Sequence, residues 1–285
     1  MTRRAPERFA DGFMFLEAPK WHRGRLWVSD VFDYKVYCIA MDGQREVVCE
    51  VPNRPSGQGF LPDGRHIVVS AKDRSLREIA NGRLGLYADL SGHAPGYVND
   101  FAIDDKGRIY VGDFGYDYDG GEPRKTTCLL RVDTDGSIVR VASEVDFPNG
   151  SAIIDEGRTL IVAETWACRI TAFDLDDHGA LSNRRVFAHL GERQPDGLCA
   201  DREGGIWVGC FNTGEFLRVI EGGQITETFQ FDGSAISCVI GGEDDQTLFM
   251  TTFLGPASEI ATDKRKSAIF TAPVEVPSPV RARPL

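Results

Sequence analysis

Oxygen-bearing side chains recur at one position of a sequence repeat, eight residues before a turn glycine, or seven in the first copy. The residues at this position are Glu17, Ser56, Asn99, Asn149, Asp196 and, in a last copy that has Asp245 in place of the glycine, Ser237. Carboxylate and amide oxygens are the ligands that hard divalent cations prefer. The set therefore predicts a site for one divalent cation or a polar substrate, with Ca²⁺ or Mg²⁺ as the first candidates and Mn²⁺ or Zn²⁺ as alternatives.

The repeat that carries these residues has the pattern of consecutive β-hairpins. Residues 99–113 read as a short strand, a tight Asp/Gly turn and a second alternating strand, and residues 129–136 add a third strand and another turn. Dividing 285 residues among six copies leaves about 47 residues per copy, enough for four short strands and their turns. Residues 1–285 are thus predicted to form a single all-β domain, a six-bladed β-propeller with four antiparallel strands per blade.

Such a fold would bring the repeated position of every blade to one end of a central channel, because the innermost strands run along the axis. A parallel α/β sheet, the main alternative for this length, needs amphipathic helices of about ten residues, and the sequence contains no convincing example. Residues 1–11 either add an outer strand to the last blade and close the ring, or form a loose end.

Composition limits the kinds of molecule and compartment that are expected for this chain. The formal charge is −11 and the sequence pI is about 5.0, which argues against nucleic-acid binding. No apolar run approaches the length of a membrane span, and the N-terminus has no signal-peptide pattern, so we expect a cytoplasmic protein. The seven cysteines include no C-x-x-C pair and the five histidines lack zinc-ligand spacing.

The motifs around the repeated position resemble those of the gluconolactonase family, which includes senescence marker protein and luciferin-regenerating enzyme. The resemblance extends from Glu-Ala-Pro-x-Trp at Glu17, through Arg-Pro-Ser-Gly at Arg54, Val-Asn-Asp at Val98 and Phe-Pro-Asn-Gly at Phe147, to Gln-Pro-Asp-Gly at Gln194. It implies a six-bladed propeller with one catalytic divalent metal.

The same resemblance implies a role for individual residues. Glu17, Asn149 and Asp196 would bind the metal, and Asn99 would help to hold substrate or metal. Asp196 would also be the catalytic base or nucleophile.

One departure from the family concerns the substrate. Sugar-lactone members carry an arginine two residues before the Asn99 position, where this chain has Tyr97. Losing that guanidinium argues against a typical sugar-acid lactone. Ser56, Tyr97, Phe114 and Trp166 are the expected substrate contacts, and aromatic residues in the loops near the mouth favour a less polar or ring-bearing substrate. The other aromatic residues of these loops are Phe13, Phe15, Tyr116, Phe211 and Phe253.

The predicted activity is metal-dependent hydrolysis of a lactone or related cyclic ester, with water attacking the carbonyl carbon and Asp196 accepting the proton. Direct attack by Asp196 is a variant of this mechanism. The alternatives are an organophosphate-type hydrolase and a non-catalytic metal-containing propeller that binds a ligand or protein. Serine-nucleophile chemistry is disfavoured because no G-x-S-x-G motif is present. The substrate is expected to be a small molecule, and the oligomeric state is left open.

Overall fold

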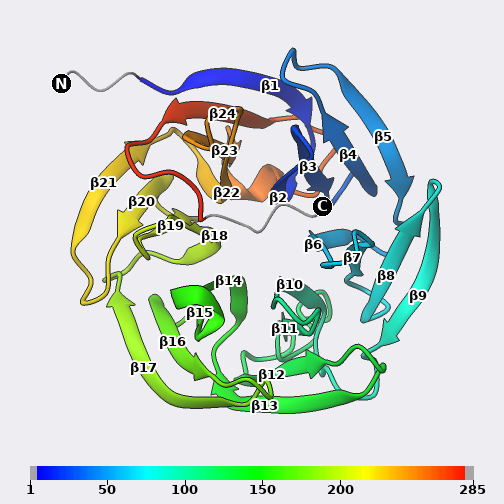
Figure 1. Ribbon diagram of the computed structural model, residues 1–285. Helices are drawn as coiled ribbons and strands as arrows, with labels where there is room; N and C mark the ends of the chain where they lie inside the picture. The colour runs from blue at the N-terminus through cyan, green and yellow to red at the C-terminus, as the bar shows by residue number, and fades with distance from the viewer. Residues whose placement is uncertain (1–4, 280–285) are drawn as a thin grey trace.

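Six four-stranded antiparallel sheets surround a central axis in the computed structural model, which describes residues 5–279 (Figure 1). The prediction of an all-β, six-bladed propeller is confirmed. Two 3₁₀ turns, η1 (Asp155–Gly157) and η2 (Ala257–Glu259), lie in connections between strands. No helix within residues 5–279 is long and apolar enough to cross a membrane.

In the first five blades the strands follow one another in the chain from the axis outward. Blade 1 contains β2 (Leu16–His22), β3 (Arg25–Asp30), β4 (Lys35–Ile39) and β5 (Arg45–Glu50). Blade 2 contains β6 (Pro55–Phe60), β7 (His66–Ser70), β8 (Ser75–Ala80) and β9 (Arg83–Asp89). Blade 3 contains β10 (Val98–Ile103), β11 (Ile109–Asp113), β12 (Thr127–Val132) and β13 (Ile138–Val145). Blade 4 contains β14 (Pro148–Ile154), β15 (Thr159–Glu164), β16 (Arg169–Leu175) and β17 (Leu181–His189). Blade 5 contains β18 (Pro195–Ala200), β19 (Ile206–Cys210), β20 (Glu215–Val219) and β21 (Ile225–Gln230).

The sixth blade joins the two ends of the chain. It contains β22 (Ser234–Gly241), β23 (Thr247–Phe253), β24 (Ser267–Pro273) and, as its outer strand, β1 (Glu7–Phe13). β1 pairs antiparallel with β24, for example Glu7 with Thr271. Of the two alternatives for residues 1–11, the closing strand is therefore correct from Glu7 onward, while residues 1–4 lie outside the described residues.

Burial differs between the second strands and the outer strands of the blades. Every residue of β7, β11, β15 and β19 is buried, because neighbouring blades cover both faces of these strands. The outer strands, such as β13, expose about every second pair of residues to solvent. Asp245 takes the left-handed conformation (φ 55°) that the missing turn glycine would have supplied.

A β-bulge interrupts every inner strand close to its N-terminal end. In β10 the register passes from Val98–Asp113 to Phe101–Val111, so three steps along β10 match two along β11. The same single-residue excess occurs in β2, β6, β14, β18 and β22. A bulge places two consecutive side chains on one side of the strand, and here it falls at the predicted site.

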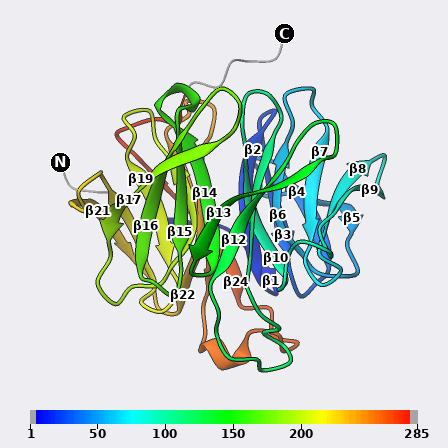
Figure 2. The same ribbon diagram turned by 90° about the horizontal axis from the view of Figure 1, so that it is seen from below.

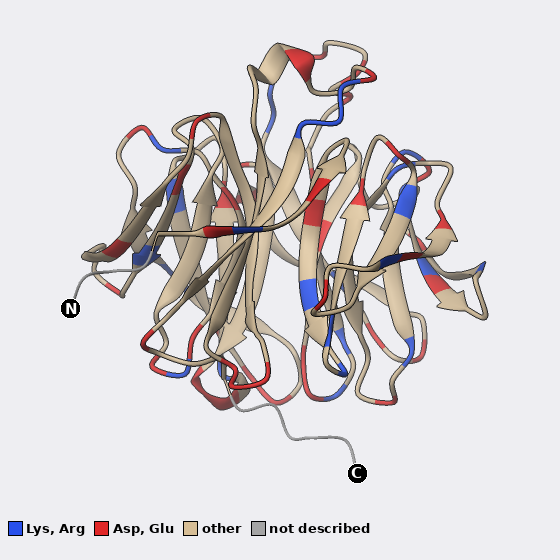
Figure 3. Ribbon diagram, turned by 90° about the horizontal axis from the view of Figure 1, so that it is seen from above, with Lys and Arg blue, Asp and Glu red and all other residues tan. Residues whose placement is uncertain are grey.

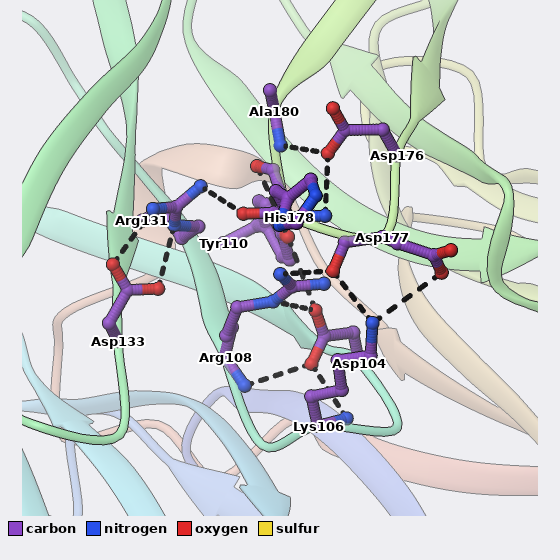
Figure 4. Close-up of polar contacts among 11 residues, drawn as sticks. Asp104, Lys106, Arg108, Tyr110, Arg131, Asp133, Asp176, Asp177, His178 and Ala180 are labelled. Carbon is purple, nitrogen blue, oxygen red and sulfur yellow. Dashed lines mark hydrogen bonds and ion pairs between the residues drawn. The ribbon is translucent and has the colours of Figure 1, made fainter.

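The two ends of the ring differ. At the end opposite the predicted site, turns of blades 3 and 4 meet in a polar network: Lys106 Nζ and Arg108 Nη1 donate to the Asp177 carbonyl oxygen at 2.6 and 3.1 Å (Figure 4). At the site end, residues 114–126 and 254–266 project together from the ring (Figure 2). These projecting loops carry charges of both signs (Figure 3).

Candidate active site

The bulged ends of the inner strands bring the predicted residues into one polar cluster. Each inner strand contacts the inner strands of the two flanking blades. Ser56 Oγ of blade 2 donates to Asn99 Oδ1 of blade 3 at 2.8 Å, and both residues are buried. The Asn149 amide of blade 4 donates a hydrogen bond to the Asp196 carboxyl group of blade 5.

Small residues after the site positions allow this close approach. A Cβ on Gly57 would lie 2.7 Å from Asp100 Oδ1, and one on Gly150 would lie 2.6 Å from the Asp196 carbonyl oxygen. Neither contact is compatible with a side chain. Glycine at these positions therefore lets the inner strands of adjacent blades meet at the axis.

The register corrects one sequence assignment. Ser234 pairs with Phe253 and Ala235 with Thr252, so Ala235 occupies in blade 6 the place that Ser56 occupies in blade 2. Ser237, the predicted sixth member, lies two residues further along β22. The miscount arose because β22 has eight residues where β6, β10 and β18 have six, so counting back eight positions from Asp245 stops two residues short. The cluster consequently has five oxygen-bearing members and an alanine.

A third carboxyl group, Asp100, joins Glu17 and Asp196. Burial raises the pKa of Asp196 to about 8, with a further increase from Asp100 and a decrease from the hydrogen bond of Asn149. Burial, followed by repulsion from Asp196 and Asp100, raises the pKa of Glu17 well above its usual range. Burial also raises the pKa of Asp100. Three neighbouring carboxyl groups whose charged forms are disfavoured make a site at which a cation would be stabilising.

One ammonium group partly offsets this charge. Lys20, three residues beyond Glu17 on β2, lowers the pKa of both Glu17 and Asp100 through its positive charge. Its side chain is half-buried.

The donor chemistry of the cluster fits a hard cation. The Asn149 NH₂ group donates to Thr165 Oγ1 at 3.2 Å and to Asp196, and Thr165 Oγ1 in turn donates to the Pro195 carbonyl oxygen at 2.8 Å. Both Asn149 contacts use the NH₂ group, so its amide oxygen can serve as a ligand. Within residues 5–279 no three His, Cys, Asp or Glu side chains are grouped as a ready metal site. The donors for a cation would therefore be a mixture of carboxylates and amides.

The predicted aromatic contacts form a continuous row over blades 3 and 4. Phe114 stacks on Phe147 with ring centroids 4.0 Å apart, and Phe147 lies 5.5 Å from Trp166. Tyr97 meets the edge of Phe114 at 6.5 Å. Phe13 and Phe253, by contrast, are completely buried in the core.

A guanidinium group lies beside Tyr97 although position 97 itself is not arginine. Arg54, from the segment that precedes β6, lies 5.9 Å from the centroid of the Tyr97 ring. The segment before blade 2 therefore brings a guanidinium group next to the Tyr97 side chain.

Sequence reasoning missed four residues of this region: Asp100, Phe147, Lys20 and Arg54. Asp100 directly follows Asn99 in the Val-Asn-Asp motif, and Phe147 precedes Asn149 by two residues in the Phe-Pro-Asn-Gly motif. A strict alternation of side chains would point Asp100 away from the channel, and only the bulge turns it inward. The approach of Arg54 to Tyr97 crosses from one blade to the next, so no local pattern signals it.

Comparisons with known proteins identify a matching family and several relatives. Residues 15–253 match the family described as SMP-30/Gluconolactonase/LRE-like region. Regucalcin from Xenopus laevis is 30% identical over 246 residues, which cover 83% of this chain and 82% of that protein. The pentonolactonase XacC from Haloferax volcanii is 31% identical over 165 residues, covering 56% of this chain and 54% of XacC. The structure of XC5397, a gluconolactonase from Xanthomonas campestris, has a TM-score of 0.78 and 25% identity, covering 95% of this chain and 89% of XC5397.

Proposed function

The chain belongs to the SMP-30/gluconolactonase/LRE-like family, and we propose that it hydrolyses a lactone or related cyclic ester with the help of one divalent cation. The observation that carries the proposal is the convergence of Glu17, Asn149 and Asp196 with Asp100 at one end of the channel, where burial and then repulsion from neighbouring carboxylates raise the pKa of Glu17 and of Asp196. The similarity to a pentonolactonase and a gluconolactonase supports a lactone as the class of substrate.

Glu17, Asn149 and Asp196 would hold the cation, with Asn99 next to them. A bound Ca²⁺, or alternatively Mg²⁺, Mn²⁺ or Zn²⁺, would polarise the carbonyl group of the substrate and acidify water. Without a cation, a pKa of about 8 keeps the Asp196 carboxyl group protonated at neutral pH. The site thus needs a positive charge before Asp196 can act as a base.

In this mechanism Asp196 accepts the proton of the attacking water, and the hydrogen bond from Asn149 orients its carboxylate. Ser56 and Asn99 hold the polar side of the substrate, while Tyr97, Phe114 and Trp166 line the apolar side. Direct attack by Asp196 on the carbonyl carbon is the alternative version. Either version makes Asp196 indispensable.

The test is hydrolysis of sugar, aliphatic and aromatic lactones by metal-stripped protein, with each of the four cations restored in turn. We expect turnover that depends on the cation and disappears in Asp196→Asn, while Asp177→Asn, which alters a fully exposed carboxylate, retains it. Turnover in D196N would refute both mechanisms. Cation binding without hydrolysis of any lactone would overturn the proposal in favour of an organophosphate-type hydrolase or a non-catalytic binding propeller, which a panel of phosphotriesters would separate.

A further inference from the structure

Three donors from blades 2 and 3 converge on a single carboxylate at the mouth of the channel. Arg54 Nη2, Lys72 Nζ and Tyr97 Oη each lie 3.2 Å from Asp119 Oδ2. Arg54 Nη1 additionally donates to Asp119 Oδ1 at 3.4 Å. Asp119 belongs to the projecting loop of residues 114–126, whereas the three donors lie in the connections β5–β6, β7–β8 and β9–β10.

The donors are built into the ring beside the candidate active site. Arg54 precedes Ser56 by two residues and Tyr97 precedes Asn99 by two residues, which corresponds to about 7 Å of extended chain. The Arg54 guanidinium lies between the rings of Phe32 and Tyr97, at 5.1 and 5.9 Å from their centroids. These contacts orient the planar group before any ligand arrives.

Two further features mark Arg54. Its backbone adopts φ 67°, a left-handed conformation that is strained for a residue with a side chain and that concentrates at functional sites. Its Nε atom is buried and has no hydrogen-bond partner. Arg54 thus retains a donor that Asp119 does not use.

Asp119 is less firmly placed than its partners. It is partly exposed, with 36% of its side chain accessible, compared with 19% for Arg54. Arg54 and Lys72 together carry two positive charges against one on Asp119. A second carboxylate arriving from solvent would find the same three donors.

We propose that Arg54, Lys72 and Tyr97 form a carboxylate-binding subsite, that Asp119 occupies it in the free protein, and that the substrate is a lactone bearing a carboxylate. That the substrate is a lactone rests on the proposed function, whereas the binding of a carboxylate does not depend on it. The substrate carboxylate replaces Asp119 and accepts hydrogen bonds from the guanidinium of Arg54, the ammonium of Lys72 and the phenol of Tyr97. The ring of the ligand then lies between Ser56 and Asn99 on one side and the aromatic row on the other.

Binding of ring ethers that cannot be hydrolysed separates this inference from the proposed reaction. The probes are tetrahydrofuran-2-carboxylate and its neutral counterpart, tetrahydrofurfuryl alcohol, titrated calorimetrically into the full chain with Ca²⁺ and again in EDTA. We expect Arg54→Gln to weaken carboxylate binding tenfold or more, by about the contribution of one charge-assisted contact, and to change alcohol binding less than twofold. We expect Asp119→Asn to strengthen carboxylate binding several-fold, because the internal competitor is gone.

Arg185→Gln is the matched control, since Arg185, on the outer strand of blade 4, pairs with Asp174 of β16 and with Glu221 in the β20–β21 turn of blade 5. Like Arg54→Gln, this variant removes one guanidinium charge, and it should leave the binding of both probes unchanged. Equal weakening of both probes by R54Q, unchanged or weaker carboxylate binding in D119N, or failure of the unaltered protein to bind the carboxylate would each overturn the subsite. None of these outcomes depends on turnover, so failure of the lactone panel is a separate result.

Discussion

The buried carboxyl group of Asp196 destabilises the metal-free folded protein at neutral pH. Its side chain is 5% exposed, and burial disfavours the charged form that the proposed reaction requires. The unfolded chain releases the proton near pH 4, whereas the folded protein holds it until about pH 8. The carboxyl group therefore makes metal-free protein progressively less stable as pH rises between these values.

Asp196→Asn is accordingly expected to abolish turnover and to stabilise the metal-free protein by about 1–2 kcal/mol at pH 7.5. The gain should shrink at pH 5, where the unfolded chain also begins to hold the proton. Urea unfolding in EDTA at both pH values measures it, with Asp177→Asn as the control. A variant less stable than the unaltered protein at both pH values would contradict this account of Asp196.

For His66 the dependence of stability on pH has the opposite sign: its burial makes the folded protein less stable as pH falls. Burial, with repulsion from His22, lowers the pKa of His66 from 6.5 to about 3. Its Nε2 donates to Gln58 Oε1 at 2.8 Å, and its ring stacks on Phe60 with centroids 4.4 Å apart. The folded protein thus holds neutral His66 where the unfolded chain binds a proton, and the resulting stabilisation is lost as pH falls below 6.5.

From this group alone we expect a loss of about 2 kcal/mol of unfolding free energy between pH 7 and pH 5. His66→Phe keeps an aromatic ring but cannot titrate, so its stability relative to the unaltered protein should improve by that amount over the same interval. His178→Asn, at an exposed position, is the control. Parallel pH profiles for H66F and the unaltered protein would rule the coupling out.

At the scale of the elements, the bulged inner strand is the unit that makes the site. The extra residue turns side chains such as Asp100 toward the axis, and a glycine or another small residue beside it admits the neighbouring blade. Gly197 illustrates the tightness, because a Cβ there would lie 2.0 Å from Ser237 Oγ and 2.3 Å from Ser237 Cβ. Strand geometry and inter-blade packing therefore depend on the same residues.

Gly197→Ala is expected to destabilise the fold by about 2–4 kcal/mol through overpacking between β18 and β22. Adding Ser237→Gly removes the two closest atoms and should recover at least half of that loss in a double-mutant cycle. Gly92→Ala, where no atom lies within 4 Å of the added Cβ, is the control. Additive effects of G197A and S237G would show that the two positions do not compete for space.

For the whole molecule, stability depends on joining the first and last strands. Phe13, at the end of β1 in blade 6, is completely buried and meets Tyr37 of blade 1 edge to face at 5.6 Å. The Arg45 guanidinium covers the same ring at 4.4 Å. Phe13 therefore links the closing blade to the first blade.

Phe13→Ala is expected to lower the unfolding free energy by about 3–5 kcal/mol, the usual cost of truncating a buried phenylalanine. Val47→Ala, on the neighbouring outer strand at 53% exposure, should change it by less than about 0.5 kcal/mol. Urea titration followed by tryptophan fluorescence compares the two. A loss in F13A no larger than in V47A would mean that closure does not contribute to global stability.

The architecture and five members of the polar cluster could be predicted from the sequence alone. Turn glycines and alternating strands are local signals, and counting back from each turn reaches the same height in every blade that keeps its glycine. The sixth position was wrong because β22 is two residues longer than β6, β10 and β18, a difference in length that the turn residues do not reveal. The metal and catalytic roles of Glu17, Asn149 and Asp196 remain predictions.

Only the tertiary structure decided which charged groups surround the polar cluster and which residues lie at the mouth of the channel. The Asp100 side chain points toward the axis because of a β-bulge, and no residue type in the strand signals that bulge. Arg54 and Asp119 meet across 65 residues of chain, and Lys72 and Tyr97 reach the same oxygen from different blades. Such contacts depend on how separate blades and their loops lie against one another. The local sequence determines the strands and turns, but it does not contain those distances.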